Sequence, residues 1–185
     1  RPDPVILAEA GPGRGTLMAD ALRAIRRAMP DFAACLRVRL IETSVRLRAV
    51  QAGVVPDAVW LDALDQVFDG PMILLANEFL DALPIRQFRR TGGVWCERWV
   101  MDGRFQDRAV GSAGDAATGA AAALPDAADG AIHERCEPAL AIAEALAARF
   151  TRHPGAALFL DYGPEASAFG DGLQALAGGR PADPL

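Results

Sequence analysis

The sequence is poor in the residues that mark several common kinds of functional site. It contains no lysine, so all 19 positive side chains are arginines, and 24 acidic residues give a formal net charge of -5. A chain without a basic surplus lacks the footprint that binding to a phosphate backbone requires, so nucleic acid is not an expected partner. The arginine bias, together with abundant alanine and glycine, is typical of a bacterial coding sequence of high GC content.

Cysteine, histidine and long apolar runs are also scarce. The cysteines are scattered without C-x-x-C spacing and the two histidines lie far apart, so no metal site is expected. These residues are Cys35, Cys96, Cys136, His133 and His153. No apolar run approaches the roughly 18 residues that a membrane span needs, and the first residues lack the pattern of a signal peptide. We therefore expect a soluble protein of a reducing, cytoplasmic compartment.

Apolar side chains are what the sequence has in quantity, since 51% of its 185 residues are hydrophobic, enough for one substantial core. Strands are expected over residues 5–8, 36–42, 58–60, 72–76 and 156–160. Helices are expected over 16–29, from the caps Thr43 and Ser44 to Gly53, and from Pro138 onward. Strands that alternate with helices predict βαβ units that assemble into one parallel sheet. The predicted fold class is α/β, a Rossmann-like doubly wound sheet with helices on both faces.

Two segments interrupt this alternation. Residues 85–90 and 94–100 flank a Thr-Gly-Gly turn, which predicts an antiparallel β-hairpin inserted into the circuit of the sheet. Residues 111–130 are rich in glycine, alanine and aspartate and are expected to form a flexible loop. With these two insertions, the whole chain is expected to form a single core domain.

The strongest local signal is the sequence Glu-Ala-Gly-Pro-Gly-Arg-Gly between the first expected strand and the first expected helix. Gly11 and Gly13 would let the backbone approach a ligand, and Gly15 would let the helix pack closely on the strand. Glu9 would order the loop or attract a cationic amine. Thr16 stands where the dinucleotide fingerprint G-x-G-x-x-G requires glycine, which favours S-adenosylmethionine over NAD. The former has no pyrophosphate to place at a helix N-terminus, and it brings a positive amine. A glycine-rich turn without a ligand is the alternative.

Polar side chains follow three further expected strands. Glu42 ends the second strand, where it could accept both ribose hydroxyls or remain an exposed strand-end acid. Asp62 follows the third strand and could accept a hydrogen bond from the adenine amine or, equally, cap the next helical segment. Asn77 and Glu78 follow the fourth strand, in the crevice where open α/β sheets bind ligands. These two, with Asp81, would carry a desolvation cost unless paired, which favours a site over a capped turn.

The chain resembles the MidA-like methyltransferase family in four segments that occur in the family's order: EAGPGRGTLMADALR, IETS, NEFLDALPIRQF and ALFLDYG. The resemblance implies the class I methyltransferase fold with S-adenosylmethionine as cofactor. It also implies protein arginine methylation on a complex I subunit, because eukaryotic members act in mitochondrial complex I assembly. Family members have a long segment before the first strand and further strands after residue 185. The chain is therefore expected to be a middle portion, truncated at both ends.

The resemblance also implies roles for individual residues. The cofactor loop would contain Gly11, Gly13 and Gly15, the ribose site Glu42, the adenine neighbourhood Asp62, and the methyl-transfer side Asn77 with Glu78.

The expected reaction is an in-line attack of a substrate nitrogen on the sulfonium methyl group. An arginine acceptor starts protonated, so a carboxylate must hold its guanidinium and receive a proton as the N–C bond forms. Glu78 and Asp81 are the candidate catalytic residues, and Asp161 and Tyr162 are second choices at the end of the last strand.

Three alternatives stay open. The first is a small-molecule N- or O-methyltransferase. The second is a non-enzymatic assembly factor that keeps the cofactor pocket and binds a client through the hairpin. The third is an NAD-dependent oxidoreductase, which Thr16 disfavours. The sequence makes no prediction of the oligomeric state.

Overall fold

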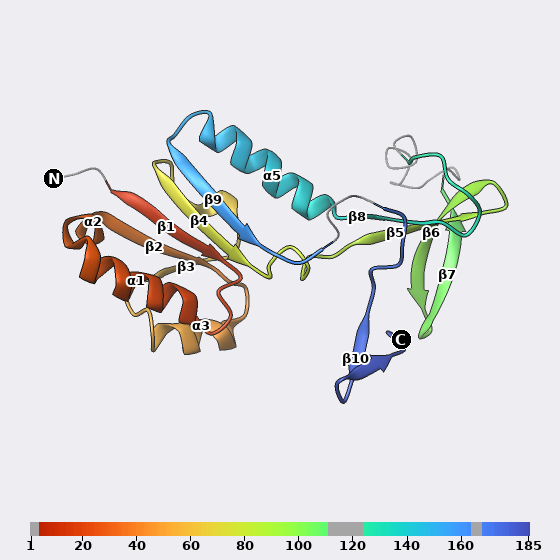
Figure 1. Ribbon diagram of the computed structural model, residues 1–185, viewed down its shortest axis with the longest axis horizontal. Coiled ribbons are helices and arrows are strands. Elements are labelled where there is room, and N and C mark those ends of the chain that lie inside the picture. The colour runs from red at the N-terminus through yellow and green to blue at the C-terminus, as the bar shows by residue number, and fades with distance from the viewer. Residues whose placement is uncertain (1–3, 111–123, 164–167) are drawn as a thin grey trace. The chain divides into compact units, whose positions relative to one another are not determined.

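The computed structural model describes residues 4–110, 124–163 and 168–185 (Figure 1). Within this part of the chain, no helix is both long and apolar enough to cross a membrane.

Contacts divide the chain into two compact units, which are described separately. Unit 1 comprises Arg1–Leu83 and Pro138–Gly163, and unit 2 comprises Pro84–Glu137 and Pro164–Leu185. The single core domain expected from the sequence stays a prediction.

Unit 1 is built on a five-stranded sheet with the order β3-β2-β1-β4-β9, in which every neighbouring pair is parallel. Its strands are β1 (Val5–Ala10), β2 (Leu36–Ile41), β3 (Val59–Leu61), β4 (Met72–Asn77) and β9 (Gly155–Leu160). All five coincide with predicted strands to within two residues. The chain runs outward from β1 to β3 and then returns to β4 on the other side of β1. The carboxyl ends of β1 and β4 therefore form the switch point where such sheets bind ligands.

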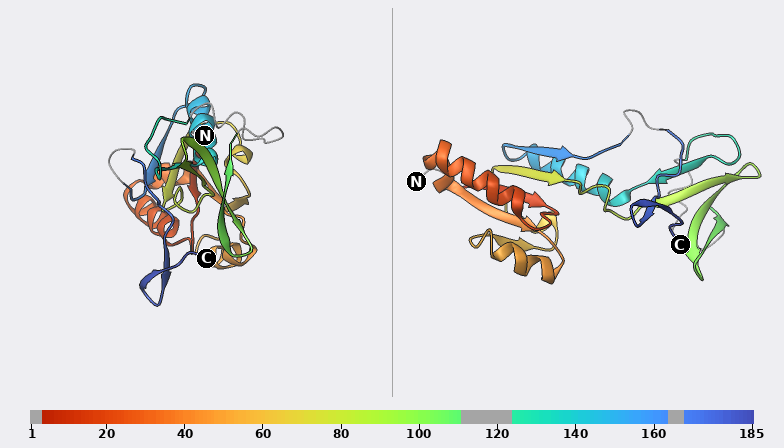
Figure 2. Two further views of the ribbon diagram at one scale, coloured as in Figure 1. Left: turned by 90° about the vertical axis from the view of Figure 1, so that its right-hand side faces the viewer. Right: turned by 60° about the horizontal axis from the view of Figure 1, so that its bottom comes forward.

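Helices lie against both faces of this sheet, as alternation along the strands requires. They are α1 (Thr16–Ala28), α2 (Pro30–Cys35), α3 (Val45–Ala52), the 3₁₀ helix η1 (Leu64–Gln66) and α5 (Glu137–Phe150). Leu7 of β1 packs with Met18 and Leu22 of α1. Ile6, the preceding residue, packs in the opposite cluster, which includes Leu146 of α5. Both helices run alongside the strands in Figures 1 and 2.

Unit 2 contains a four-stranded antiparallel sheet with the order β7-β6-β5-β8. Its strands are β5 (Arg86–Thr91), β6 (Val94–Met101), β7 (Arg104–Ala109) and β8 (Ile132–Arg135), and a separate pair joins β10 (Ala175–Ala177) to β11 (Arg180–Ala182). The expected hairpin is present as β5 and β6. It belongs to this second sheet, however, and four strands of unit 2 were not predicted.

The expected loop at 111–130 falls mostly outside the described residues, since only its last part, 124–130, is described, and that part contains no helix or strand.

Candidate functional site

The glycine-rich loop connects β1 to α1 and has a left-handed backbone at Gly11, Gly13 and Gly15, with φ of 64°, 52° and 78°. A Cβ at Gly11 would lie 2.9 Å from Cδ2 of Phe79, and one at Gly15 would lie 3.2 Å from Cγ2 of Val54. A Cβ at Gly13 would meet no atom within 4 Å. Packing therefore requires two of these glycines, whereas Gly13 faces open space that a ligand could approach.

A polar cavity of 340 Å³ lies against this loop and is here called the loop cavity. Its walls bring Glu9, Asn77 and Glu78 together with Gly11 and Gly13. Glu9 is only 2% exposed, and its Oε2 has no hydrogen-bond partner among the described residues. Burial raises the pKa of Glu9 to about 7, partly offset by a hydrogen bond from the backbone N–H of Met18. A buried carboxylate with one oxygen left without a partner would be stabilised by a cationic group placed in this cavity.

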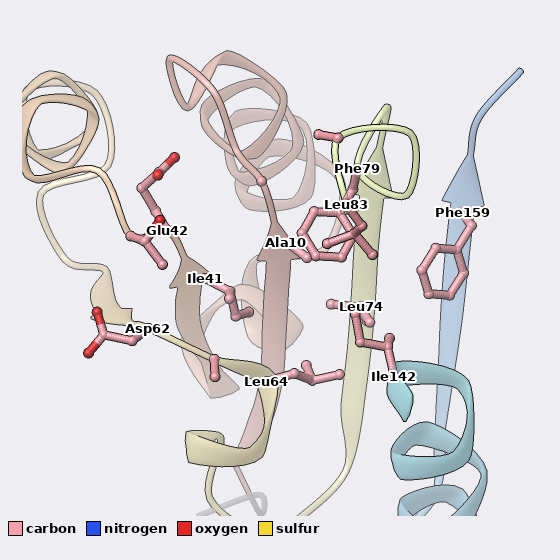
Figure 3. A pocket seen from close by; sticks show the side chains of 14 residues that line it. Ala10, Ile41, Glu42, Asp62, Leu64, Leu74, Phe79, Leu83, Ile142 and Phe159 are labelled. Carbon is pink, nitrogen blue, oxygen red and sulfur yellow. The ribbon is translucent and has the colours of Figure 1, made fainter. Parts of the chain in front are cut away.

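A second, largely apolar cavity of 430 Å³ lies next to the first and is here called the apolar cavity (Figure 3). Gly11 lines both cavities. The side chains of Glu42 and Asp62 lie toward one side of the apolar cavity, and those of Phe79 and Phe159 toward the other. This arrangement suits a flat apolar ring system joined to a group that carries hydroxyls.

The two acids of the apolar cavity are held by neighbouring donors. Oε1 of Glu42 accepts a hydrogen bond of 2.8 Å from the backbone N–H of Ser44. Oδ1 of Asp62 accepts one of 2.6 Å from Nη2 of Arg48. Asp62 does not cap the following helix, because η1 has Ala63 at its N-cap and no side-chain cap. The helix-cap interpretation of Asp62 is therefore wrong.

The polar side chains at the end of β4 and just after it are exposed rather than desolvated. Asn77, Glu78 and Asp81 are all exposed, so the desolvation argument made from the sequence is wrong for them. Glu78 has a left-handed backbone with φ of 46°, which is uncommon outside glycine. Asn77 and Glu78 line the loop cavity. Asp81 is not among the described residues that line either cavity.

The end of β9 holds this segment in place. Oδ2 of Asp161 accepts hydrogen bonds from the backbone N–H groups of Leu80, at 3.0 Å, and Asp81, at 3.3 Å. Tyr162 hydrogen-bonds the side chain of Asp81, and this bond, with the nearby carboxylates, raises the pKa of Tyr162. Asp161 therefore supports the loop, and Tyr162 joins Asp81 at an exposed, acidic edge.

The sequence did not point to several residues that shape these cavities. Gln51 is fully buried and contacts both the glycine loop and Glu42, and Trp60 bonds to it. Ile142 of α5 and Leu64 of η1 form apolar walls. The helical stripe that contains Ile142 was visible in the sequence, but a pattern of apolar residues does not distinguish a cavity wall from ordinary core.

Comparison with known proteins assigns the chain to a family. A family model described as "Putative S-adenosyl-L-methionine-dependent methyltransferase" matches residues 1–185. The chain belongs to this methyltransferase family. It is 31% identical over 183 residues to the mitochondrial protein arginine methyltransferase NDUFAF7 of Mus musculus, covering 85% of this chain and 42% of that protein. The human protein of that name is 32% identical with the same coverage. The chain thus spans less than half the length of these relatives, and the resemblance inferred from the sequence is confirmed.

Solved structures agree with this assignment. An uncharacterized protein from Burkholderia thailandensis superposes with a TM-score of 0.64 at 30% identity, covering 88% of this chain and 44% of that one. A second structure from that organism, bound to S-adenosyl-homocysteine, superposes with a TM-score of 0.57 at 27% identity, covering 86% of this chain and 42% of that one. The expected α/β class I methyltransferase fold is confirmed.

Proposed function

We propose that this chain contains the cofactor site of an S-adenosylmethionine-dependent methyltransferase. The observation that carries the proposal is the pair of cavities that share Gly11 at the carboxyl ends of β1 and β4. One is apolar with acids at its side, and the other contains the buried carboxylate of Glu9, whose Oε2 has no hydrogen-bond partner among the described residues. Adenosine and a cationic amino acid group need this combination, and a relative of the same fold binds S-adenosyl-homocysteine.

The residues that line the two cavities fit the parts of this cofactor. In the apolar cavity, Glu42 would accept hydrogen bonds from the ribose hydroxyls, and Asp62 would lie near the adenine amine. In the loop cavity, Glu9 would pair with the amine of the methionine portion, beside Asn77. The open face of Gly13 would allow the cofactor to approach the backbone.

We propose a protein arginine as the methyl acceptor, supported by the names of the relatives. When bound, the cofactor supplies an electrophilic methyl group on a sulfonium. Glu78, in the wall of the loop cavity, would hold the acceptor guanidinium and accept a proton from its attacking nitrogen. Asp81, joined to Tyr162, would hold the same cation from the exposed edge. By the sequence resemblance, a respiratory complex I subunit is the candidate acceptor protein.

The experiment is transfer of a labelled methyl group from S-adenosylmethionine into candidate acceptors. We expect label in arginine of a protein acceptor, and Glu78→Gln should lower kcat by about 100-fold or more, the usual range for loss of a proton acceptor. Asp102→Asn is the matched control, because Asp102 is also exposed and also has a left-handed backbone, with φ of 51°.

Other outcomes would favour the alternatives. Label found in small molecules alone would favour a small-molecule methyltransferase. Cofactor binding without transfer to any acceptor would favour a non-enzymatic assembly factor. Unimpaired transfer by Glu78→Gln would remove Glu78 from the mechanism.

A further inference from the structure

We propose that Gln51, held in one orientation by Trp60, is a positioning residue that aligns Glu42 and the glycine loop for ribose binding. The inference rests on the proposed function, because it assumes that Glu42 binds the ribose of the cofactor. Gln51 lies on α3 and is 0% exposed. A polar side chain is stable at such a position only when its hydrogen bonds are made within the protein.

The amide of Gln51 joins three elements that the chain brings together from distant positions. Its Nε2 donates to the carbonyl oxygen of Gly13 at 2.8 Å, across 38 positions of sequence, and to Oε2 of Glu42 at 3.3 Å. Its Oε1 accepts from the indole Nε1 of Trp60 on β3 at 2.8 Å. One buried amide therefore links the cofactor loop, the end of β2 and the edge strand of the sheet.

The chemistry of the indole fixes which way the amide points. An indole N–H can only donate, so the amide oxygen must face Trp60 and the amide nitrogen must face the other two partners. Both of those partners are acceptors, a backbone carbonyl and a carboxylate. A reversed amide would place oxygen against two oxygens and nitrogen against a donor. Trp60 thus selects the orientation in which Gln51 supports Glu42.

These bonds leave Glu42 prepared for two hydroxyl groups. Each carboxylate oxygen has room for about two hydrogen bonds. Oε1 accepts one from the backbone N–H of Ser44 and Oε2 accepts one from Gln51, so each oxygen keeps capacity for another donor. The two neighbouring hydroxyls of a ribose can supply these two donors, one for each oxygen of Glu42. Gln51 acts through Glu42 and the loop and is not assigned a contact with the cofactor.

Packing shows that α3 is fitted directly against the loop. The Cβ that any other residue would carry at Gly15 would lie 3.3 Å from Cγ of Gln51. One turn earlier on α3, Arg48 donates through Nε to the carbonyl oxygen of Glu42 at 2.6 Å. The same face of one helix therefore holds both the backbone and the side chain of Glu42.

The test compares the affinities of two ligands, S-adenosylhomocysteine and its 2′-deoxyribose analogue, by calorimetry. A hydrogen bond to a charged group should make the wild-type protein prefer the ribose ligand by roughly tenfold or more. Gln51→Met keeps the volume but removes the amide, and it should reduce this preference to within about threefold of equality. Trp60→Phe keeps an aromatic ring but removes the N–H group that fixes the orientation of the Gln51 amide. It should reduce the preference for ribose to a value between those of the wild type and Gln51→Met.

Gln87→Met is the matched control. Gln87 is also buried and also bonded through its amide, to Glu134 at 2.6 Å and to Asp171 at 2.7 Å, but it belongs to unit 2. This variant should lower the Tm while keeping the wild-type preference for ribose. The ratio of the two affinities thus separates positioning from a general loss of stability.

The possible outcomes separate a failure of the proposed cofactor site from a failure of the proposed role of Gln51. If wild-type protein binds neither ligand, or binds both equally, the proposed cofactor site or its ribose assignment fails, and the inference fails with it. If wild type prefers ribose and Gln51→Met keeps that preference, Gln51 is merely structural and the inference is overturned. If Gln51→Met does not fold, Trp60→Phe decides: a reduced preference supports the proposal, and an unchanged one overturns it.

Discussion

The chemistry of Glu9 shows what a single buried residue contributes to this protein. Its carboxylate is 2% exposed, and burial raises its pKa from 4.5 to about 7. In the unfolded chain this carboxyl group titrates near its ordinary pKa. Between these two values the native state binds more protons than the unfolded state, so stability must fall as the pH rises through this window. Glu9 is therefore a cost to folding above pH 7, which is common for a residue kept for binding.

Substitution of Glu9 should remove this dependence. We predict that Glu9 makes the wild-type protein lose about 3 kcal/mol of unfolding free energy between pH 4 and pH 8, and that Glu9→Gln removes this loss. Chemical denaturation at both pH values measures this, with Glu144→Gln on the exposed face of α5 as the control. An unchanged pH dependence in Glu9→Gln would contradict the account.

Ligand binding should show the opposite trend with pH. The proposed contact with the cofactor amine requires charged Glu9, and with a pKa of about 7 the charged fraction rises steeply from pH 6 to pH 8. We predict that wild-type affinity for S-adenosylhomocysteine rises by up to about tenfold over this range. Glu9→Gln should bind more weakly and with little pH dependence. Parallel curves for the two proteins would show that Glu9 does not meet the amine.

Sequence reasoning at the residue scale pointed to most of the acids and glycines that line the two cavities, but it did not point to Gln51 or Trp60. The acids and glycines could be located because they follow predicted strands. The carboxyl ends of parallel strands meet at one edge of the sheet, where ligands bind. The bond between Gln51 and Gly13 spans 38 positions and depends on how α3 packs. A single glutamine in a predicted helix gives no sign of such a partner.

At the scale of elements, the strands of unit 1 were predictable because most of them are short, mainly apolar runs, as in β1, β4 and β9, which is the pattern typical of a parallel sheet. In unit 2 this signal is weak. β7, with the sequence RFQDRA, is exposed along its whole length, and β10 and β11 have three residues each. Pairing with β6, rather than an apolar pattern, makes β7 a strand.

The loop after β4 offers a test at this scale. Asp161→Ala would remove the acceptor for two backbone N–H groups of this loop, those of Leu80 and Asp81, and we predict a loss of roughly 1–2 kcal/mol of stability. Methyl transfer should fall more than cofactor affinity does, because the loop contains Glu78 and Asp81. Asp129→Ala is the matched control, since Asp129 accepts from the backbone N–H groups of Gly92 and Gly93 in unit 2. Equal losses of transfer in both variants would rule out a specific role for Asp161.

At the scale of the whole molecule, the cofactor site proposed here lies within unit 1. Every residue that lines the two cavities comes from its two segments. Unit 2 supplies an antiparallel sheet with exposed apolar side chains, among them Trp99 and Val100. The chain covers less than half of its relatives' length. Methyl transfer and the identity of the acceptor protein are therefore proposed for the whole protein.

The most direct test of the cofactor site is calorimetric titration with S-adenosylmethionine of wild-type protein and two glycine variants. Gly13→Val and Gly103→Val place a side chain at similar left-handed positions, with φ of 52° and 66°, and at both a Cβ meets no atom within 4 Å. Their backbone strain should be alike, about 1–2 kcal/mol. We predict that wild type and Gly103→Val bind alike and that Gly13→Val loses at least about tenfold in affinity. Absence of binding by wild type, or equal losses in both variants, would contradict the account.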